Sequence, residues 1–116
     1  MNFGLQNIDI KKIREVFLSF PQIETVVLYG SRALGNYKPA SDIDLTLKGK
    51  DLNLTIQQNI EQQLDDLMLP YKFDISIYDQ ISNTELLEHI KRVGKLFFEN
   101  NKIEDGKIEW HKWPFP

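Results

Sequence analysis

The chain has 116 residues, of which 41% are hydrophobic, and 17 acidic residues outnumber 14 basic ones to give a net charge of −3. This length predicts a single domain with its own core. The acidic balance argues against DNA or RNA as the main partner, because phosphate contacts need a basic surplus. The chain has no cysteine, which excludes disulfides and thiolate metal sites. It also has neither a long apolar run nor the layout of a secretory signal, so we expect no membrane association and a cytoplasmic protein.

Periodicity and turn residues divide the chain into alternating helices and strands. In chain order they predict a helix over 9–20, a strand over 24–29, a helix over 31–34, a loop over 36–41, a strand over 42–48, a helix over 52–69, a strand over 71–78, a helix from 83 or 84 to 93 and a strand over 95–99. For the last segment, the alternative is a helix that continues to Phe98. The alternating strands are typical of a sheet with one covered and one open face. We therefore expect a small α/β (α+β) domain, with a mixed sheet and helices packed on one face.

The predicted core spans about residues 9–99 of a single domain, 1–116. The tail 101–116 contains an Asp-Gly turn and the aromatic residues Trp110 and Trp113. Packing of this tail against its own domain is the favoured interpretation, and an exposed partner-docking patch is the alternative.

Two aspartates stand two residues apart at the start of the predicted strand over 42–48. Side chains at such positions project from one face, with Cα atoms about 6.5 Å apart. Asp is disfavoured in strands, so the presence of Asp42 and Asp44 in this strand needs another explanation. Asp74 has the same setting in the strand over 71–78, and if the two strands pair, the three carboxylates converge on the open face.

Such a cluster requires protons or cations, because two carboxylates about 4 Å apart repel by about 4 kcal/mol. With no His or Cys nearby, the oxygen ligands favour Mg²⁺. The alternative is an amphipathic strand whose aspartates are simply solvated.

Gly30 and Ser31 follow a hydrophobic strand directly and open the short predicted helix. A helix N-terminus offers free backbone N–H groups and a positive dipole end, which together suit an anion. Gly30 permits close approach of a phosphate, and the Ser31 hydroxyl adds a hydrogen-bond donor. Arg32 adds a charged guanidinium group, whose geometry suits a phosphate. The sequence is not a Walker A loop, since no Gly-Lys-Ser/Thr follows. A tight turn without any ligand is the alternative.

The stretch from Gly30 to Asp44 reads Gly-Ser, ten residues and Asp-Ile-Asp, and Asp74 follows downstream. This arrangement resembles the nucleotidyltransferase superfamily that includes DNA polymerase beta, and within it the minimal nucleotidyltransferases, or MNT proteins. The resemblance covers about residues 9–99 and does not extend to the tail.

The resemblance implies a set of site residues and a reaction. Asp42 and Asp44 would bind two Mg²⁺ ions, and Asp74 would hold the second ion near the attacking hydroxyl and accept its proton. Contacts to the nucleotide would come from Gly30, Ser31, Arg32 and Ser41. The implied reaction transfers a nucleoside monophosphate, most plausibly AMP from ATP, to a hydroxyl and releases pyrophosphate.

The resemblance also implies a partner. In the MNT branch the usual partner is a small helical HEPN-type RNase toxin, and some members adenylylate a tyrosine of that toxin. Because nearly the whole chain is used to build the core, we expect the acceptor to lie on another protein. The alternatives are a non-catalytic antitoxin that neutralises its partner by binding and a metal-dependent phosphodiesterase. The sequence does not decide between a monomer, a homo-oligomer and a hetero-oligomer.

Other polar residues are interpreted as structural. His89 lies on a predicted helix without a second metal ligand in phase, so a structural or surface role is favoured. Lys91 and Arg92 complement the C-terminal dipole of that helix. For Lys38, in the loop before the aspartates, a surface position is favoured over a contact with phosphate. His111 lies in the tail.

Overall fold

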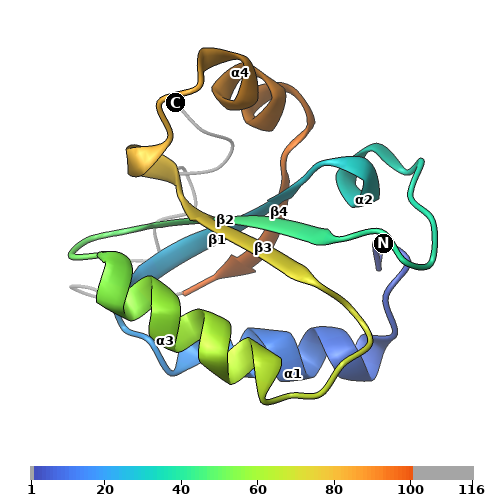
Figure 1. The fold of residues 1–116 in the computed structure, drawn as a ribbon, viewed down its shortest axis with the longest axis horizontal. Coiled ribbons are helices and arrows are strands. Elements are labelled where there is room, and N and C mark those ends of the chain that lie inside the picture. Colours follow the sequence, from blue (N-terminus) through green and yellow to red (C-terminus); the bar gives the residue numbers. More distant parts are fainter. Residues whose placement is uncertain (1, 101–116) are drawn as a thin grey trace, which may run out of the picture.

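The computed structural model describes residues 2–100. In chain order it contains α1 (Asn7–Leu18), β1 (Ile23–Tyr29), α2 (Ser31–Leu34), β2 (Ile43–Gly49), α3 (Leu54–Asp65), β3 (Phe73–Ile77), the 3₁₀ turn η1 (Tyr78–Gln80), α4 (Thr84–Val93) and β4 (Lys95–Glu99) (Figure 1). The predictions for the tail, its Asp-Gly turn included, fall outside the described residues. Between residues 2 and 100, no helix combines the length and the apolar character that crossing a membrane requires.

The last two elements have the predicted bounds. Gly94 leaves the helical conformation, with φ −57° and ψ 142°, directly after α4. A helix that continues to Phe98 is therefore wrong, and β4 begins at Lys95.

Two helices differ from the prediction at their ends. α1 begins at Asn7 with Gln6 as its N-cap, so Asp9, where the predicted helix began, lies in the first turn and is buried. α3 begins later than predicted because the side chain of Asn53 accepts a hydrogen bond from the Ile56 N–H at 2.9 Å. It ends at Asp65, ahead of the turn that contains Met68. A side-chain cap rather than apolar spacing thus sets the start of α3.

The four strands form one mixed sheet in the order β3-β2-β1-β4. β1 is antiparallel to both β2 and β4, whereas β2 and β3 are parallel. A parallel pair needs a crossover connection, and α3 provides it. The predicted mixed sheet is confirmed.

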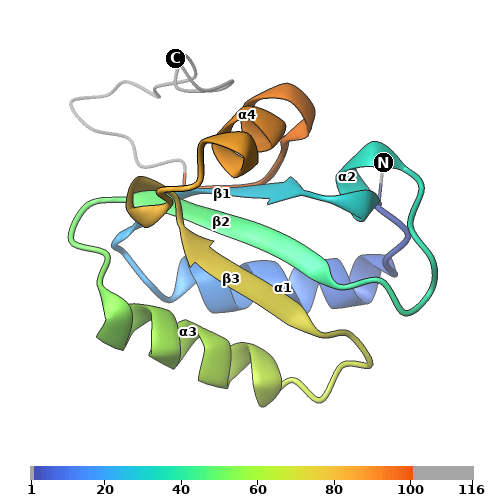
Figure 2. The same cartoon turned by 45° about the horizontal axis from the view of Figure 1, so that its top comes forward.

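Helices lie on both faces of the sheet (Figure 2). α1 and α3 cover one face and enclose the larger core, in which Leu28, Leu45 and Ile75 pack with residues of both helices. On the opposite face α4 packs through Ile90 against Val27 and Tyr29 of β1. The face expected to be open is therefore partly covered, because β1 is apolar on both sides.

Candidate active site

The three aspartates lie at the start of β2 and β3, on the face of the sheet that carries α4. Asp44 pairs in register with Asp74 on the parallel strand β3 and with Tyr29 on the antiparallel strand β1. Asp42 precedes β2. Asp42 and Asp74 are exposed, and Asp44 is half-buried. The structure thus places Asp44 next to both of the other aspartates.

Burial and neighbouring charge act together on Asp44. Its pKa is raised to about 6, first by desolvation, then by the negative charge of Asp74 and that of Asp42. Both other aspartates are therefore close enough to repel the Asp44 carboxylate. A cation between them would relieve this repulsion.

The donor set fits a hard divalent cation. The three side chains offer only carboxylate oxygens, which suit Mg²⁺. Within residues 2–100, however, no group of three His, Asp or Glu side chains is arranged so that it could hold a metal ion. Because Asp42 and Asp74 are exposed, their side chains are free to change rotamer when a cation binds.

A glycine turn lies against Asp44. Gly30 has φ +74° and ψ −156°, a combination that is essentially restricted to glycine. A Cβ at this position would overlap Oδ2 of Asp44. Gly30 is thus required by its backbone conformation and by its contact with the central carboxylate.

The turn leads directly into α2. The Gly30 carbonyl accepts hydrogen bonds from the N–H groups of Ala33 and Leu34, and Gly35 ends the helix in a left-handed conformation. In the described part of the chain, the N–H groups of Ser31 and Arg32 have no acceptor. These two amides remain available to an anion beside Asp44.

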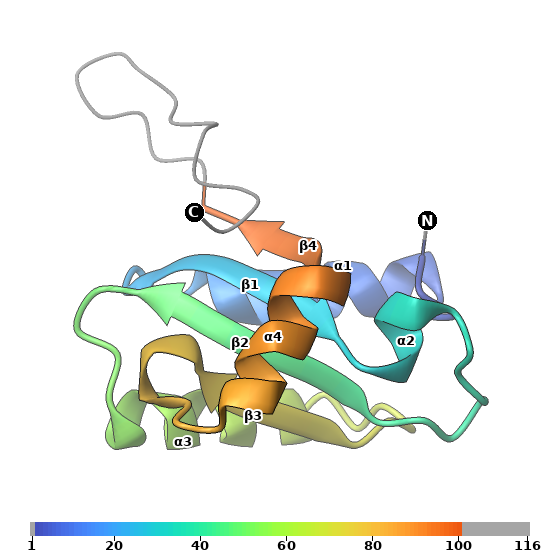
Figure 3. The same ribbon diagram turned by 90° about the horizontal axis from the view of Figure 1, so that it is seen from above.

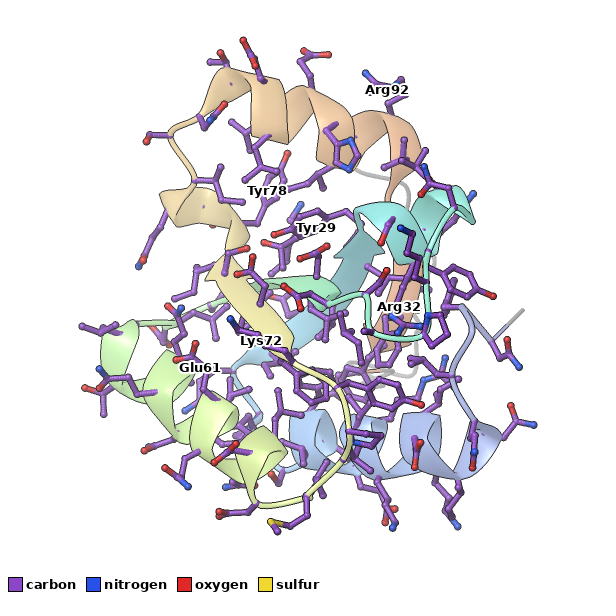
Figure 4. The ribbon with its side chains drawn as sticks, turned by 45° about the vertical axis from the view of Figure 1, so that its right-hand side comes forward. Tyr29, Arg32, Glu61, Lys72, Tyr78 and Arg92 are labelled. Carbon is purple, nitrogen blue, oxygen red and sulfur yellow. The ribbon has the colours of Figure 1, made fainter. Side chains whose placement is uncertain are left out.

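Arg32 has a different setting from the one predicted. Its side chain is only 1% exposed and its guanidinium donates to the carbonyl oxygens of Phe3, Pro39 and Ser41 at 2.9–3.2 Å. The guanidinium carbon also lies 5.3 Å from the ring centroids of both Tyr37 and Tyr71. Figure 4 shows Arg32 enclosed below α2. This geometry favours a structural role for Arg32 over a phosphate contact.

Ser41 belongs to the same loop. Its carbonyl accepts two of the Arg32 hydrogen bonds, and its hydroxyl accepts a hydrogen bond from the Lys38 N–H at 2.8 Å. The loop that precedes Asp42 is thus held by Arg32 and closed by Ser41. The predicted role of Ser41 in nucleotide binding stays a prediction.

Two residues of this region were not predicted as part of the site. Tyr29 lies between the sheet and α4 (Figure 4). Its pKa is raised by burial and by the charges of Asp74 and Asp44, while the neighbouring Ser76 hydroxyl acts in the opposite direction. His89 of α4 accepts a hydrogen bond from the Gly30 N–H through Nε2 at 3.1 Å. Strand geometry puts Tyr29 on the same side of β1 as Val27, two residues earlier, but no sequence signal connects His89 with Gly30.

The chain matches the protein family described as "Polymerase beta, Nucleotidyltransferase" over residues 11–103. It belongs to this family. The matched range contains the glycine turn, the three aspartates and every strand of the sheet, so the predicted family and its nucleotidyltransferase fold are confirmed. No curated protein is similar enough in sequence to match this nucleotidyltransferase-family chain.

Several solved structures share the fold. A toxin–antitoxin structure with AMP-PNP has 22% sequence identity and a TM-score of 0.65, with 78% of this chain and 73% of the other covered. A complex of a tri-AMPylated HEPN toxin with its MNT antitoxin, from Shewanella oneidensis, has 19% identity and a TM-score of 0.61, with 83% and 74% covered. The toxin–antitoxin MntA-HepT has 20% identity and a TM-score of 0.61, with 82% and 74% covered. At these identities the likeness establishes the common fold.

Proposed function

We propose that this nucleotidyltransferase-family protein is a Mg²⁺-dependent enzyme that transfers AMP from ATP to a hydroxyl group of a partner protein. The observation that carries the proposal is the position of Asp44. It is paired with Asp74, repelled by Asp42 and in contact with Gly30, the residue that opens α2. Carboxylates beside a turn with available N–H groups suit a metal-bound triphosphate.

The proposed roles follow from the placement of each group. Asp42, Asp44 and Asp74 would hold two Mg²⁺ ions, which neutralise the triphosphate and align the attacking and leaving oxygens. The N–H groups of Ser31 and Arg32, with the Ser31 hydroxyl, bind phosphate oxygens.

Asp74 accepts the proton of the acceptor hydroxyl. It is better suited to this than Asp44, because it is exposed and lies on β3, the strand at one edge of the sheet.

We infer that the partner is a small helical HEPN-type toxin and that this chain acts as its antitoxin in the cytoplasm. Three structurally similar proteins occur in toxin–antitoxin complexes, and in one of them the HEPN toxin is AMPylated. Residues 2–100 are largely taken up by one sheet and the helices that cover it. This arrangement favours an acceptor that comes from another chain.

The test is an incubation of the protein with α-labelled ATP, Mg²⁺ and the HEPN-type protein of the same locus. We expect label on the partner, loss of the label in the Asp42→Asn/Asp44→Asn variant, and loss on chelation of Mg²⁺. Glu61→Gln is the matched control, because Glu61 is an exposed acidic residue on α3, away from the site (Figure 4). Label that survives in the Asp42→Asn/Asp44→Asn variant would contradict the assigned chemistry.

A non-catalytic antitoxin is the second candidate. It is favoured by one observation, namely that no three acidic or His side chains within residues 2–100 are already arranged to hold a metal ion. Calorimetry separates the two functions. Heat of binding with Mg-ATP supports the enzyme, whereas tight partner binding without any Mg-ATP binding supports the plain antitoxin.

A further inference from the structure

α4 contacts the glycine turn through the polar side chain of His89. His89 is half-buried, and its Nε2 atom accepts the Gly30 N–H at 3.1 Å. An imidazole nitrogen that accepts a hydrogen bond carries no proton, so the neutral ring holds its proton on Nδ1. The His89 ring also meets the Tyr29 ring edge-on, with centroids 6.1 Å apart and an interplanar angle of 80°.

This hydrogen bond acts on the peptide that determines the direction of the turn. Gly30 tolerates conformations that other residues do not, so its own backbone preference restrains the turn weakly. The contact of Gly30 with Asp44 restrains it from one side. The hydrogen bond to His89 restrains the Tyr29–Gly30 peptide from the side of α4. The orientation of that peptide determines the direction of the next two N–H groups, those of Ser31 and Arg32.

The position of α4 over the turn is set by one buried side chain and an N-cap. Ile90, which follows His89, is fully buried against Val27 and Tyr29. Asn83 caps the helix through a hydrogen bond from the Leu86 N–H at 3.1 Å. Figure 3 shows α4 lying across the sheet. In the native state His89 therefore projects from a helix whose position is defined by packing and by its cap, as a positioning group requires.

We propose that His89 is a positioning residue. By accepting the Gly30 N–H, it holds the turn in the conformation that directs the N–H groups of Ser31 and Arg32 towards the phosphates of a nucleotide. Its contribution to nucleotide binding rests on the proposed function, but its effect on the turn does not.

Two substitutions separate the hydrogen bond from ring packing. His89→Phe keeps an aromatic ring against Tyr29 and removes the acceptor. His89→Gln removes the ring and retains an acceptor oxygen at a similar distance from the backbone. Glu88→Gln is the matched control on the same helix, since Glu88 is exposed. Circular dichroism of each variant verifies that it is folded.

The first measurement is NMR on the ¹⁵N-labelled protein without nucleotide. A scalar coupling between Gly30 N and His89 Nε2 across the hydrogen bond is expected in the wild type. His89→Phe should shift the Ser31 and Arg32 amide resonances and speed their hydrogen exchange, whereas His89→Gln should restore them towards the wild type. Absence of the coupling, or unchanged Ser31 and Arg32 amides in His89→Phe, would overturn the proposal.

The second measurement is titration with Mg-ATP. Loss of one net hydrogen bond predicts binding that is about threefold to tenfold weaker in His89→Phe, with recovery in His89→Gln and no change in Glu88→Gln. Wild-type affinity in His89→Phe would overturn the role of His89 in nucleotide binding. A wild-type protein that binds no Mg-ATP would instead contradict the proposed function, while the NMR result still decides whether His89 positions the turn.

Discussion

Asp44 is a carboxylate held half-buried beside two others. Its pKa is raised to about 6 by desolvation, Asp74 and Asp42. A group whose pKa is higher in the folded than in the unfolded chain binds protons preferentially in the folded state. Its contribution to stability is fully present below the unfolded value of about 4 and is lost as the pH rises through the folded value.

We therefore expect the metal-free protein to lose part of its free energy of unfolding between about pH 4 and about pH 7 because of Asp44. Urea unfolding across this range, in the wild type and in Asp44→Asn, measures the effect. The variant should be the more stable protein at neutral pH and should show the flatter pH dependence. Asp65→Asn is the control, as Asp65 is exposed at the end of α3. Parallel pH curves for the wild type and Asp44→Asn would show that Asp44 is not perturbed.

Gly30 and Gly35 differ in what a side chain would meet. Both have a positive φ, but a Cβ at Gly30 would overlap Asp44 Oδ2, whereas a Cβ at Gly35 has open space around it. Gly35→Ala should cost about 1 kcal/mol, from its backbone alone. Gly30→Ala should cost about 2–4 kcal/mol, because its backbone region is more restrictive and Asp44 must also move.

Denaturant unfolding measures both losses, and the double variant Gly30→Ala/Asp44→Ala tests the contact. Removing the Asp44 side chain should recover part of the loss caused by Gly30→Ala. Strict additivity of the two changes would contradict the contact.

At the scale of the elements, the loop before Asp42 depends on Arg32. The guanidinium of Arg32 joins this loop, through Pro39 and Ser41, to the N-terminal segment at Phe3. Arg32→Met leaves those carbonyl oxygens without their donor, so we expect a loss of about 2–4 kcal/mol in the free energy of unfolding. It should also weaken Mg-ATP binding, because the Asp42 backbone becomes less fixed.

Arg14→Met is the matched control for this prediction. Arg14 likewise donates to one carbonyl, that of Phe97 at 2.8 Å, and covers an aromatic ring at 5.3 Å, but its side chain is exposed. Its loss should therefore cost less than about 1 kcal/mol. Equal losses for the two arginine variants would contradict the structural role of Arg32.

Most elements could be predicted because their signals are local. The alternation of Phe73, Asp74 and Ile75 predicts a strand with its aspartate opposite the core, and the structure pairs that strand with β2. The positions of the helix ends were less predictable, since Asn53 caps α3 through a side-chain hydrogen bond that apolar spacing does not reveal. The cover that α4 provides was missed because it depends on Val27 and Tyr29, on the far side of β1 from the main core.

The residues around the site could be predicted only in part. The spacing from Gly30 to Asp44 indicates the turn and the carboxylates, because both lie within one short stretch. The burial of Arg32 depends on Phe3 and Tyr71, which are far from it in the sequence. The hydrogen bond of His89 spans 59 positions. Contacts of this kind depend on the completed fold rather than on a local pattern.

At the scale of the whole molecule, the two faces of the sheet are unequally packed. The face covered by α1 and α3 carries the larger cluster of buried apolar residues, whereas the apolar cluster beneath α4 has only Val27, Tyr29 and Ile90 as buried members among the described residues. Regions with fewer buried apolar contacts open at lower free energy. We expect native-state hydrogen exchange to show α4 opening before α1 and β1.

Ile90→Val and Ile13→Val form a matched pair for this prediction, because both isoleucines are fully buried. Ile13→Val should lower protection throughout the domain by about 1 kcal/mol. Ile90→Val should lower protection mainly in α4. Amides of α4 that exchange only by global unfolding would contradict the unequal packing.

The pairing of Asp44 with Asp74 is achieved by neighbouring strands, and α3 merely links them. The turn that follows α3 protrudes at Met68, whose side chain is 87% exposed. We therefore expect this turn to tolerate the insertion of an additional segment. A peptide epitope or a fluorescent protein inserted there would leave the pairing of Asp44 with Asp74 unchanged. Such a fusion would allow the protein to be followed in cells.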